Sequence, residues 1–237
     1  MDQGVDRIVK LCDDKISQLN AVTNNLANIN TPGFKFERLY FAAKNEKTKD
    51  TFETLLSSPV PYIDYSEGMM QKTDNPLDVA IHGEGFFSIQ TKEGVAYTRK
   101  GNFTVNKNNQ LVTQSGEYVL GESGPLVLNG KNVTIDNEGR IRVDGNDVGK
   151  LSIIKFENLK ALVRYGNGLF MDPGDSGMKM MEKPSVSSLH LELSNVNAVN
   201  EMVEMINIQR SFESYQKVIQ MMADFDKLST SRMGRLA

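Results

Sequence analysis

Both ends of this chain carry apolar residues at the spacing of an amphipathic α-helix, and the long middle of the chain does not. The first stripe steps by three and four positions and consists of Val5, Val9, Cys12, Ile16, Leu19, Val22 and Leu26. Such steps place the residues on one face of a helix. We expect this helix to end just before Pro32, which lacks a backbone N–H and restricts the residue that precedes it.

The C-terminal segment, about 195–233, shows a second and longer helical pattern. Its apolar residues alternate steps of three and four, as in the seam of a coiled coil; they are Met205, Ile208, Phe212, Tyr215, Ile219 and Met222. Val199, Val203 and Ile206 widen this stripe at its beginning. Neither Gly nor Pro occurs within 195–233, so one continuous helix is expected.

The middle of the chain, from about 59 to 184, consists of short apolar or alternating runs that turn residues separate. The runs are 77–81, 86–91, 95–99, 103–105, 110–113, 118–120, 126–128, 133–135, 140–143 and 151–156. Asp144-Gly145 is typical of a two-residue hairpin turn, in which both central residues need a positive φ. Many short strands at this spacing indicate an antiparallel sandwich or open barrel.

These patterns predict an α+β fold in which N- and C-terminal helices pair as a coiled coil and flank a central antiparallel all-β domain. We expect a helix and turn over 1–33, an extended or partly disordered arm over 34–58, and the β domain over 59–184. A strand-like lead-in and the long helix then occupy 185–237. Two helices cannot cover the whole C-terminal stripe, so helices of neighbouring subunits are expected to complete it.

Composition argues against several classes of function. The chain has 27 Lys and Arg residues against 30 Asp and Glu, a net charge of −3 that does not favour nucleic acid or an anionic membrane. The single Cys12 excludes an internal disulfide, and with His82 and His190 it gives no zinc-ligand spacing. We therefore expect no cofactor, no metal and no small-molecule substrate.

Membrane insertion and secretion by a cleaved signal are also not expected. The longest apolar runs are far shorter than the roughly 20 residues that a membrane helix needs. The charged N-terminus lacks the apolar core of a secretory signal. The residues alone thus predict a cytoplasmic protein, unless a route that needs no signal peptide exports it.

Catalytic and ligand-binding motifs have simpler interpretations as turns. Gly83-Glu84-Gly85 has the beginning of a nucleotide loop, but the strand-like run 86–90 follows it where such a loop needs a helix. The acidic turns at 136–139 and 144–147 lack the ligand order of a calcium loop. No G-x-S-x-G elbow occurs. We expect no enzyme and no catalytic residue, and the alternative from another class is a β-sandwich binding module.

Three blocks of the sequence resemble the bacterial flagellar basal-body rod and hook family. The first is 24–35, Asn-Asn-Leu-Ala-Asn-Ile-Asn-Thr-Pro-Gly-Phe-Lys, and the second is 73–87 together with 97–101. The third comprises 194–196, 201–203 and 209–213. In the second block the family-like positions are Asn75, Pro76, Leu77, Asp78, Gly83, Gly85, Phe86 and Phe87.

The resemblance implies a structural subunit of the flagellar rod, with paired terminal helices in the inner tube of the rod and the β domain outside. Its partners are then other rod subunits, copies of itself, and the flagellar type III export apparatus, which needs no cleaved signal. The short chain is most similar to proximal rod members of the family, and next to distal ones.

The stripes and the resemblance together give the candidate assembly residues. In the first helix and its turn they are Val9, Cys12, Ile16, Leu19, Asn25, Leu26, Asn28, Asn30, Pro32 and Gly33. In the C-terminal helix they are Val199, Val203, Met205, Ile206, Ile208, Phe212, Tyr215, Ile219 and Met222. We expect Asn25, Asn28 and Asn30 to fix the turn after the first helix through bonds from side chain to backbone.

Overall fold

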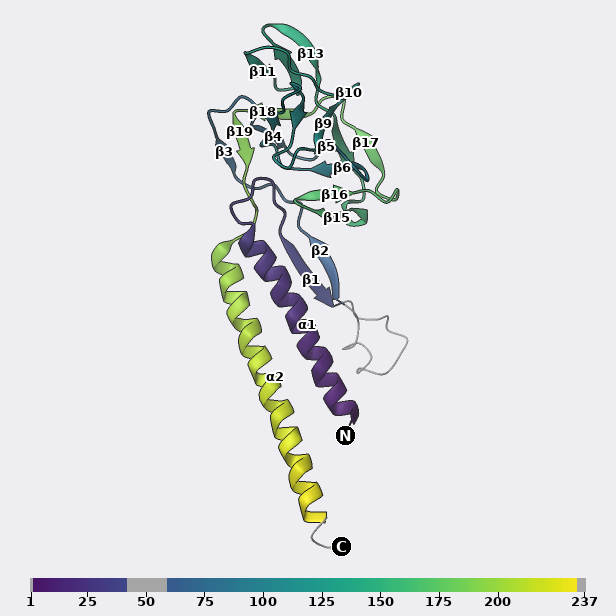
Figure 1. The fold of residues 1–237 in the computed structure, drawn as a ribbon, viewed down its shortest axis with the longest axis vertical. Coiled ribbons are helices and arrows are strands. Elements are labelled where there is room, and N and C mark those ends of the chain that lie inside the picture. Colours follow the sequence, from purple (N-terminus) through teal and green to yellow (C-terminus); the bar gives the residue numbers. More distant parts are fainter. Residues whose placement is uncertain (1, 42–58, 234–237) are drawn as a thin grey trace. The chain divides into compact units, whose positions relative to one another are not determined.

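The computed structural model describes residues 2–41 and 59–233, and the chain divides into two compact units (Figure 1). The helical unit comprises Met1–Ala27, Glu37–Tyr62 and Asn197–Ala237, and the β unit comprises Asn28–Phe36 and Ile63–Val196. The portion of the expected arm over 42–58 lies outside the described residues. We describe each unit by itself.

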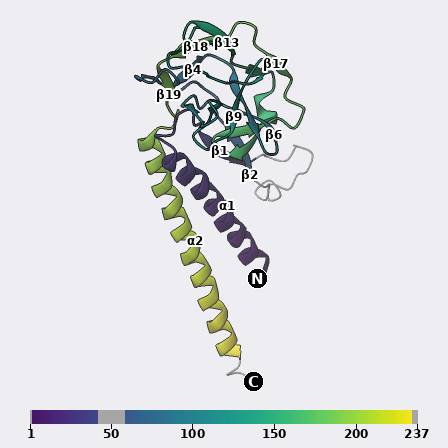
Figure 2. The same cartoon turned by 45° about the horizontal axis from the view of Figure 1, so that its top comes forward.

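The helical unit contains both helices that the apolar stripes predict, α1 (Asp2–Ala27) and α2 (Ala198–Met233). They lie side by side in both views (Figures 1 and 2). The helix α2 begins three residues later than expected because Asn197 caps it: Asn197 Oδ1 accepts the Asn200 N–H at 3.1 Å. Within the expected arm, strand β1 (Glu37–Phe41) pairs with β2 (Pro59–Ile63).

The β unit, whose residues are all described, is antiparallel throughout, as the sequence predicts. Its elements are β3 (Met70–Lys72), β4 (Val79–His82), β5 (Phe86–Thr91), β6 (Gly94–Thr98), β7 (Thr104–Val105), β8 (Leu111–Val112), β9 (Tyr118–Gly121), β10 (Gly124–Pro125), β11 (Val133–Ile135), β12 (Arg140–Val143), β13 (Asn146–Lys150), β14 (Ile153–Phe156), the 3-10 helix η2 (Leu159–Ala161), β15 (Val163–Gly166), β16 (Leu169–Met171), β17 (Met178–Met180), β18 (Ser185–Ser188) and β19 (His190–Glu192).

The largest sheet of the β unit has the strand order β15-β16-β6-β5-β9-β8-β7. Strand β10 adds to β9, and β14 joins β5 to the edge strand β17. The strands β11, β12 and β13 form a second sheet, and β18–β4 and β19–β3 are two-stranded pairs.

The large sheet has an apolar cluster on each face. Adjacent residues of a strand point to opposite faces, and Phe87 and Phe86 accordingly belong to different clusters. Phe87 lies in the main core with Ile89 and Ile153. Phe86 lies in a smaller cluster that includes Phe156, at 5.5 Å between ring centroids. Burial on both faces explains why the adjacent Phe86 and Phe87 are both apolar.

The Asp144-Gly145 turn joins β12 to β13 with φ of +50° and +87°, as the pair predicts. The expected strand over 126–128 is wrong, because only Val127 forms a bridge, to Gln110. Leu126 and Leu128 are instead buried in the main core from a loop. A run of three apolar residues thus supplies core side chains without forming a ladder.

Candidate assembly site

A buried polar contact joins α1 to α2 within the helical unit. Asn25 Nδ2 donates to Glu201 Oε2 at 2.9 Å, and the two residues are 0% and 3% exposed. Asn25 also bonds with the backbone of Glu37, its Nδ2 donating to the carbonyl at 2.8 Å and its Oδ1 accepting the N–H at 3.0 Å. The Asn25 side chain therefore connects α1 to both α2 and β1 through hydrogen bonds.

Part of the predicted seam is buried within the helical unit. Cys12 and Ile208 are buried, and burial is the largest cause of the raised pKa of the Cys12 thiol. Leu19 and Phe212 are half-buried. Together with Ile16 and Ile208 they line a groove of about 380 Å³ between the two helices.

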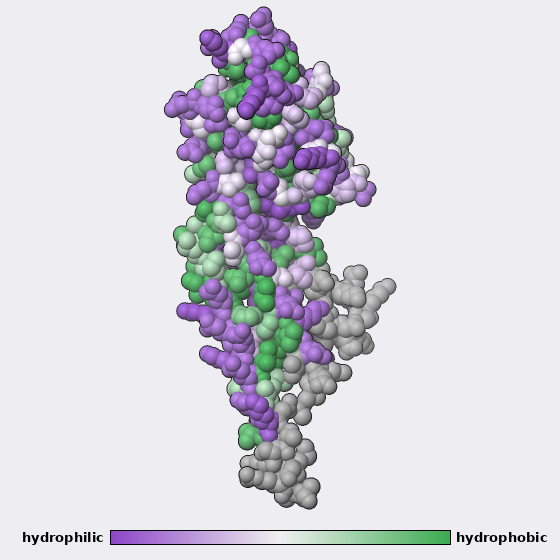
Figure 3. All heavy atoms as spheres, in the orientation of Figure 1, coloured by the Kyte–Doolittle hydropathy of each residue, from purple (hydrophilic) through white to green (hydrophobic). Residues whose placement is uncertain are grey.

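Other predicted seam residues remain exposed on the single chain. On α2 the exposed predicted residues at the beginning of the helix are Val199, Val203 and Ile206, with exposed fractions of 70%, 53% and 48%, and the neighbouring Met202, which was not predicted, is 51% exposed. On α1, Val9 and Ile16 are exposed. Green surface gathers over the two helices (Figure 3). The remaining α2 seam residues, Met205, Tyr215, Ile219 and Met222, and Leu26 on α1, are half-buried.

The segment after α1, residues 28–36, forms a turn that belongs to the β unit and is called the turn segment here. Asn28 holds its first residues, since its carbonyl accepts the Thr31 N–H at 3.0 Å and its Oδ1 accepts the Thr31 hydroxyl at 3.1 Å. Asn30 is exposed and Pro32 half-buried. Asn25 bonds through its side chain with the backbone of Glu37, directly after the turn segment.

Gly33 lies against the backbone that directly follows strand β6. Its φ is +64°, and a Cβ there would lie 2.4 Å from the backbone carbon of Arg99. Its N–H donates to the carbonyl of Glu192 at 2.7 Å. Only glycine allows both the conformation and the approach.

Three buried charged side chains lie behind this turn. Lys35 Nζ is 2.5 Å from Glu192 Oε1 and also donates to the Ser66 carbonyl at 2.5 Å. Both side chains of the Lys35–Glu192 pair are 0% exposed, and Arg99 Nη1 lies 3.7 Å from Glu192 Oε2. Burial lowers the pKa of Lys35, against the opposing effect of Glu192. Burial likewise lowers the pKa of Arg99.

The Asn195 side chain connects its own segment of the β unit to Phe36 and to the segment 64–66 through hydrogen bonds. Its Oδ1 accepts the Phe36 N–H at 2.7 Å, and its Nδ2 donates to the carbonyls of Asp64 at 2.9 Å and Ser66 at 3.2 Å. Arg164 stacks its guanidinium 4.8 Å from the centre of the Phe34 ring. The turn segment is thereby fixed to strands that are far away in the sequence.

The central block forms turns that begin β4 and β5. Asn75 Nδ2 donates to Asp78 Oδ1 at 2.9 Å, and Asn75 Oδ1 accepts the Leu77 N–H at 3.2 Å, while Pro76 is exposed. Gly83 and Gly85 have φ of +74° and +131°. A strand follows them, as the turn interpretation predicts.

Sequence reasoning missed Lys35, Arg99, Glu192, Asn195 and Glu201 as site residues. The available signal was a charge within or at the end of an apolar run: Glu192 lies between two leucines, and Arg99 ends the strand-like run 95–99. A charge in such a place is buried only with a partner. A local pattern, however, does not show which distant residue pairs with the buried charge.

Within residues 2–41 and 59–233, no three His, Cys, Asp or Glu side chains are grouped so that they would hold a metal ion. In the same ranges, neither helix combines the length and apolar character that a membrane span requires.

Three family models match the chain, one in each part of the fold. Residues 15–35 match "Flagella basal body rod protein", which covers the end of α1 and the turn segment. Residues 80–147 match "Flagellar hook protein FlgE/F/G D1 domain". Residues 188–230 match "Flagellar basal body rod FlgEFG protein C-terminal", which covers β19 and most of α2.

Relatives that match over most of this chain are also flagellar basal-body rod proteins. The chain is 31% identical over 229 residues to the flagellar basal-body rod protein FlgF of Caulobacter vibrioides, covering 92% of this chain and 93% of the relative. It is 34% identical over 230 residues to FlgG of Buchnera aphidicola, covering 85% and 88%. It is 32% identical over 238 residues to FlgG of Bacillus subtilis, covering 86% and 88%. This chain therefore belongs to the flagellar basal-body rod protein family, as a structural subunit of the rod.

Proposed function

We propose that this chain forms part of the proximal rod and assembles through its two terminal helices, which pair as a coiled coil. One observation supports this mode of assembly: the apolar beginning of α2 is exposed directly beside the buried Asn25–Glu201 contact. Full burial of a Val, Ile or Met side chain contributes roughly 1.5–3 kcal/mol. The exposed Val199, Met202, Val203 and Ile206 therefore favour a further helix packed against this face.

The neighbours in this proposal are other rod subunits and copies of this chain. An interface that repeats by a constant rotation and translation does not close, so it extends along an axis. We propose further that the chain reaches the rod through the flagellar type III export apparatus without a cleaved signal. Nucleic acid, a membrane and small molecules are not partners in this proposal.

Proximal and distal positions differ in where the basal body stops without the chain. Electron cryotomography of cells that lack it should show basal bodies that end before the proximal rod is complete. A basal body with a complete proximal rod and no distal rod would instead favour the distal position. That alternative is supported by relatives named FlgG with identities similar to those named FlgF. A complete rod would contradict the proposal.

A substitution in the seam tests the coiled coil separately. Phe212→Asp or Ile219→Asp places a charge on the half-buried face of α2 and should stop rod growth while the β unit stays folded. Gln216→Asp, on the exposed face of the same helix, is the matched control. Normal motility of cells that carry Phe212→Asp as their only copy would contradict the seam assignment.

A further inference from the structure

Two Asn-Gly pairs occur in the sequence, Asn129-Gly130 and Asn167-Gly168, and both lie in the β unit. Glycine has no side chain to shield its backbone nitrogen, so this nitrogen is open to the side chain of a preceding asparagine. The two pairs have the same covalent chemistry. Any difference in their reactivity therefore comes from the fold.

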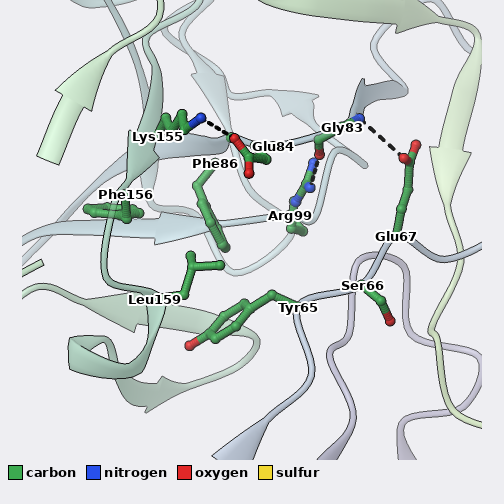
Figure 4. Close-up of a pocket in the computed structure, with 11 residues that line it drawn as sticks. Tyr65, Ser66, Glu67, Gly83, Glu84, Phe86, Arg99, Lys155, Phe156 and Leu159 are labelled. Atoms are coloured by element: carbon green, nitrogen blue, oxygen red, sulfur yellow. Dashed lines mark hydrogen bonds and ion pairs between the residues drawn. The ribbon is translucent and has the colours of Figure 1, made fainter. Parts of the chain in front are cut away.

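The pair Asn129-Gly130 lies in an exposed, irregular segment between Leu128 and β11. Neither of its residues has a positive φ. The Gly130 N–H donates to no atom among residues 2–41 and 59–233. By contrast, the likewise exposed Gly83 donates its N–H to Glu67 at 3.2 Å (Figure 4). The Gly130 N–H is therefore open to a base from the solvent.

The Asn129 side chain is held through its carbonyl oxygen. Asn109 Nδ2 donates to Asn129 Oδ1 at 3.0 Å. Negative charge develops on Oδ1 when a nucleophile attacks Cγ, so a donor on this oxygen favours the attack. Asn129 Nδ2, which has to leave, has no acceptor in the part of the chain that the structure describes.

The pair Asn167-Gly168 is confined to a tight hairpin turn. It joins β15 to β16 where Gly166 is paired with Leu169, and φ is +50° at Asn167 and +72° at Gly168. Gly168 is buried, and its carbonyl accepts the Thr98 hydroxyl at 2.8 Å. An attack on Asn167 Cγ has to rotate the Gly168 peptide unit out of this turn. The hairpin therefore opposes the reaction.

We propose that Asn129 is a site of spontaneous deamidation in the folded chain, and that the hairpin protects Asn167. The Gly130 nitrogen attacks Asn129 Cγ and forms a C–N bond that closes a succinimide ring, and the Cγ–Nδ2 bond breaks. The Nδ2 group leaves as ammonia, because it takes up the proton that the Gly130 nitrogen gives off. Water then opens the ring at either of its carbonyls and yields aspartate or isoaspartate. The reaction needs only the folded chain and water, so it does not depend on the proposed function.

The main chain is fixed on both sides of Asn129. Leu128 is 3% exposed in the main core, and the N–H groups of Lys131 and Asn132 donate to the Asp144 carboxylate at 3.2 and 3.0 Å. Either product adds one negative charge to the net charge of −3. Isoaspartate also inserts a methylene into the main chain, so the two bonds to Asp144 cannot both keep their geometry.

Peptide mass spectrometry of the purified full chain measures both sites at once. The chain is kept in mildly alkaline buffer, folded in one sample and unfolded in guanidinium chloride in another, and fragmentation locates each converted asparagine. The two asparagines should react at similar rates when unfolded. In the folded chain Asn129 should keep most of its rate, whereas Asn167 should slow by a factor of about ten, which corresponds to about 1.4 kcal/mol for opening the turn. Equal rates at the two sites of the folded chain, or a faster reaction at Asn167, would overturn the proposal.

Matched variants connect the product with the site. Glutamine keeps the amide group, but the ring that it would form is larger and closes far more slowly. Isoaspartate is detected by enzymatic methylation with an isoaspartyl methyltransferase and labelled S-adenosylmethionine. Asn129→Gln should lose most of the label that the aged, folded wild-type chain takes up, and Asn167→Gln should keep it. Undiminished labelling of Asn129→Gln would place the isoaspartate elsewhere and overturn the proposal.

Discussion

Asn25 on α1 donates a 2.9 Å hydrogen bond to Glu201 on α2, although 176 positions separate them in the sequence. Both side chains are buried, so the bond forms away from competing water. Removing one partner leaves the other buried and unsatisfied, which is costlier than the bond itself is stabilising. The contact therefore fixes the register of the two helices in the helical unit.

Asn25→Ala should destabilise the helical unit by about 1–3 kcal/mol, because Glu201 and the Glu37 backbone both lose a partner. Urea unfolding followed by far-UV circular dichroism measures the loss of helix. Thr23→Ala, on the exposed side of the same helix, is the matched control and should change the midpoint little. Equal midpoints for the two variants would show that the amide does not hold the helices together.

Lys35→Met should destabilise the β unit by about 3–5 kcal/mol, the usual cost of leaving a buried charge without its partner. Lys35 is 0% exposed and contacts Glu192, so methionine keeps the volume and removes the pairing. Chemical denaturation followed by tyrosine fluorescence measures the change. Lys92→Met replaces an exposed lysine and should leave the midpoint in place. A lowered midpoint in both variants would point to a general effect of lost charge.

The same lysine gives the stability of the fold a pH dependence with a definite sign. Burial lowers the pKa of Lys35 below its ordinary value of 10.5. Between the folded-state pKa and 10.5 the unfolded chain still binds the proton that the folded chain has released, so stability rises with pH in that window. Relative to Lys35→Met, the wild-type free energy of unfolding should therefore increase there. Parallel profiles would contradict the lowered pKa.

Gly101→Ala should be among the most destabilising glycine substitutions in the β unit. A Cβ at Gly101 would lie 1.5 Å from the Val79 carbonyl oxygen, so the backbone must move, at a cost of about 3 kcal/mol. At Gly116 the added Cβ meets no atom within 4 Å, and only its φ of +95° opposes alanine, at about 1 kcal/mol. Thermal unfolding of the two variants compares these costs. A larger effect at Gly116 would contradict the close approach.

Val203→Asp should leave the folded chain unchanged and prevent rod assembly. Val203 is 53% exposed on the single chain, so its replacement should change the free energy of unfolding by no more than about 0.5 kcal/mol. In cells with this variant as the only copy, we expect loss of motility and basal bodies that end before the proximal rod is complete. Asn207→Asp adds the same charge at an exposed polar position of α2 and should keep motility. If Val203→Asp cells were motile, no further helix would pack against the exposed apolar face of α2 in the rod.

Local patterns in the sequence predict the elements that form through interactions between residues close together in the chain. The steps of three and four residues predict α1 and α2, and Asp144-Gly145 predicts its hairpin turn. Strand β13 is missed because Asn146–Lys150 is mostly exposed and polar and so has no apolar alternation. Strand β17, Met-Lys-Met, does alternate but has only three residues, all exposed, and is too short to be recognised from its pattern.

The charged cluster is beyond local patterns because its members meet only in the folded chain. Lys35 and Glu192 are 157 positions apart, and neither has a feature that points to the other. The turn segment joins the β unit for a related reason: the N–H of Gly33 donates to the Glu192 carbonyl, and the N–H of Phe36 donates to the Asn195 side-chain oxygen. Residues before and after this segment in the chain belong to the helical unit.

The division of the chain into interleaved segments has a mechanical consequence. The backbone passes between the helical and β units at 27–28, 36–37, 62–63 and 196–197. A pull or a twist applied to one unit is thus shared among four covalent links, and a nick in any one of them leaves three intact. Several stretches of main chain, and not a single hinge, therefore connect the two units.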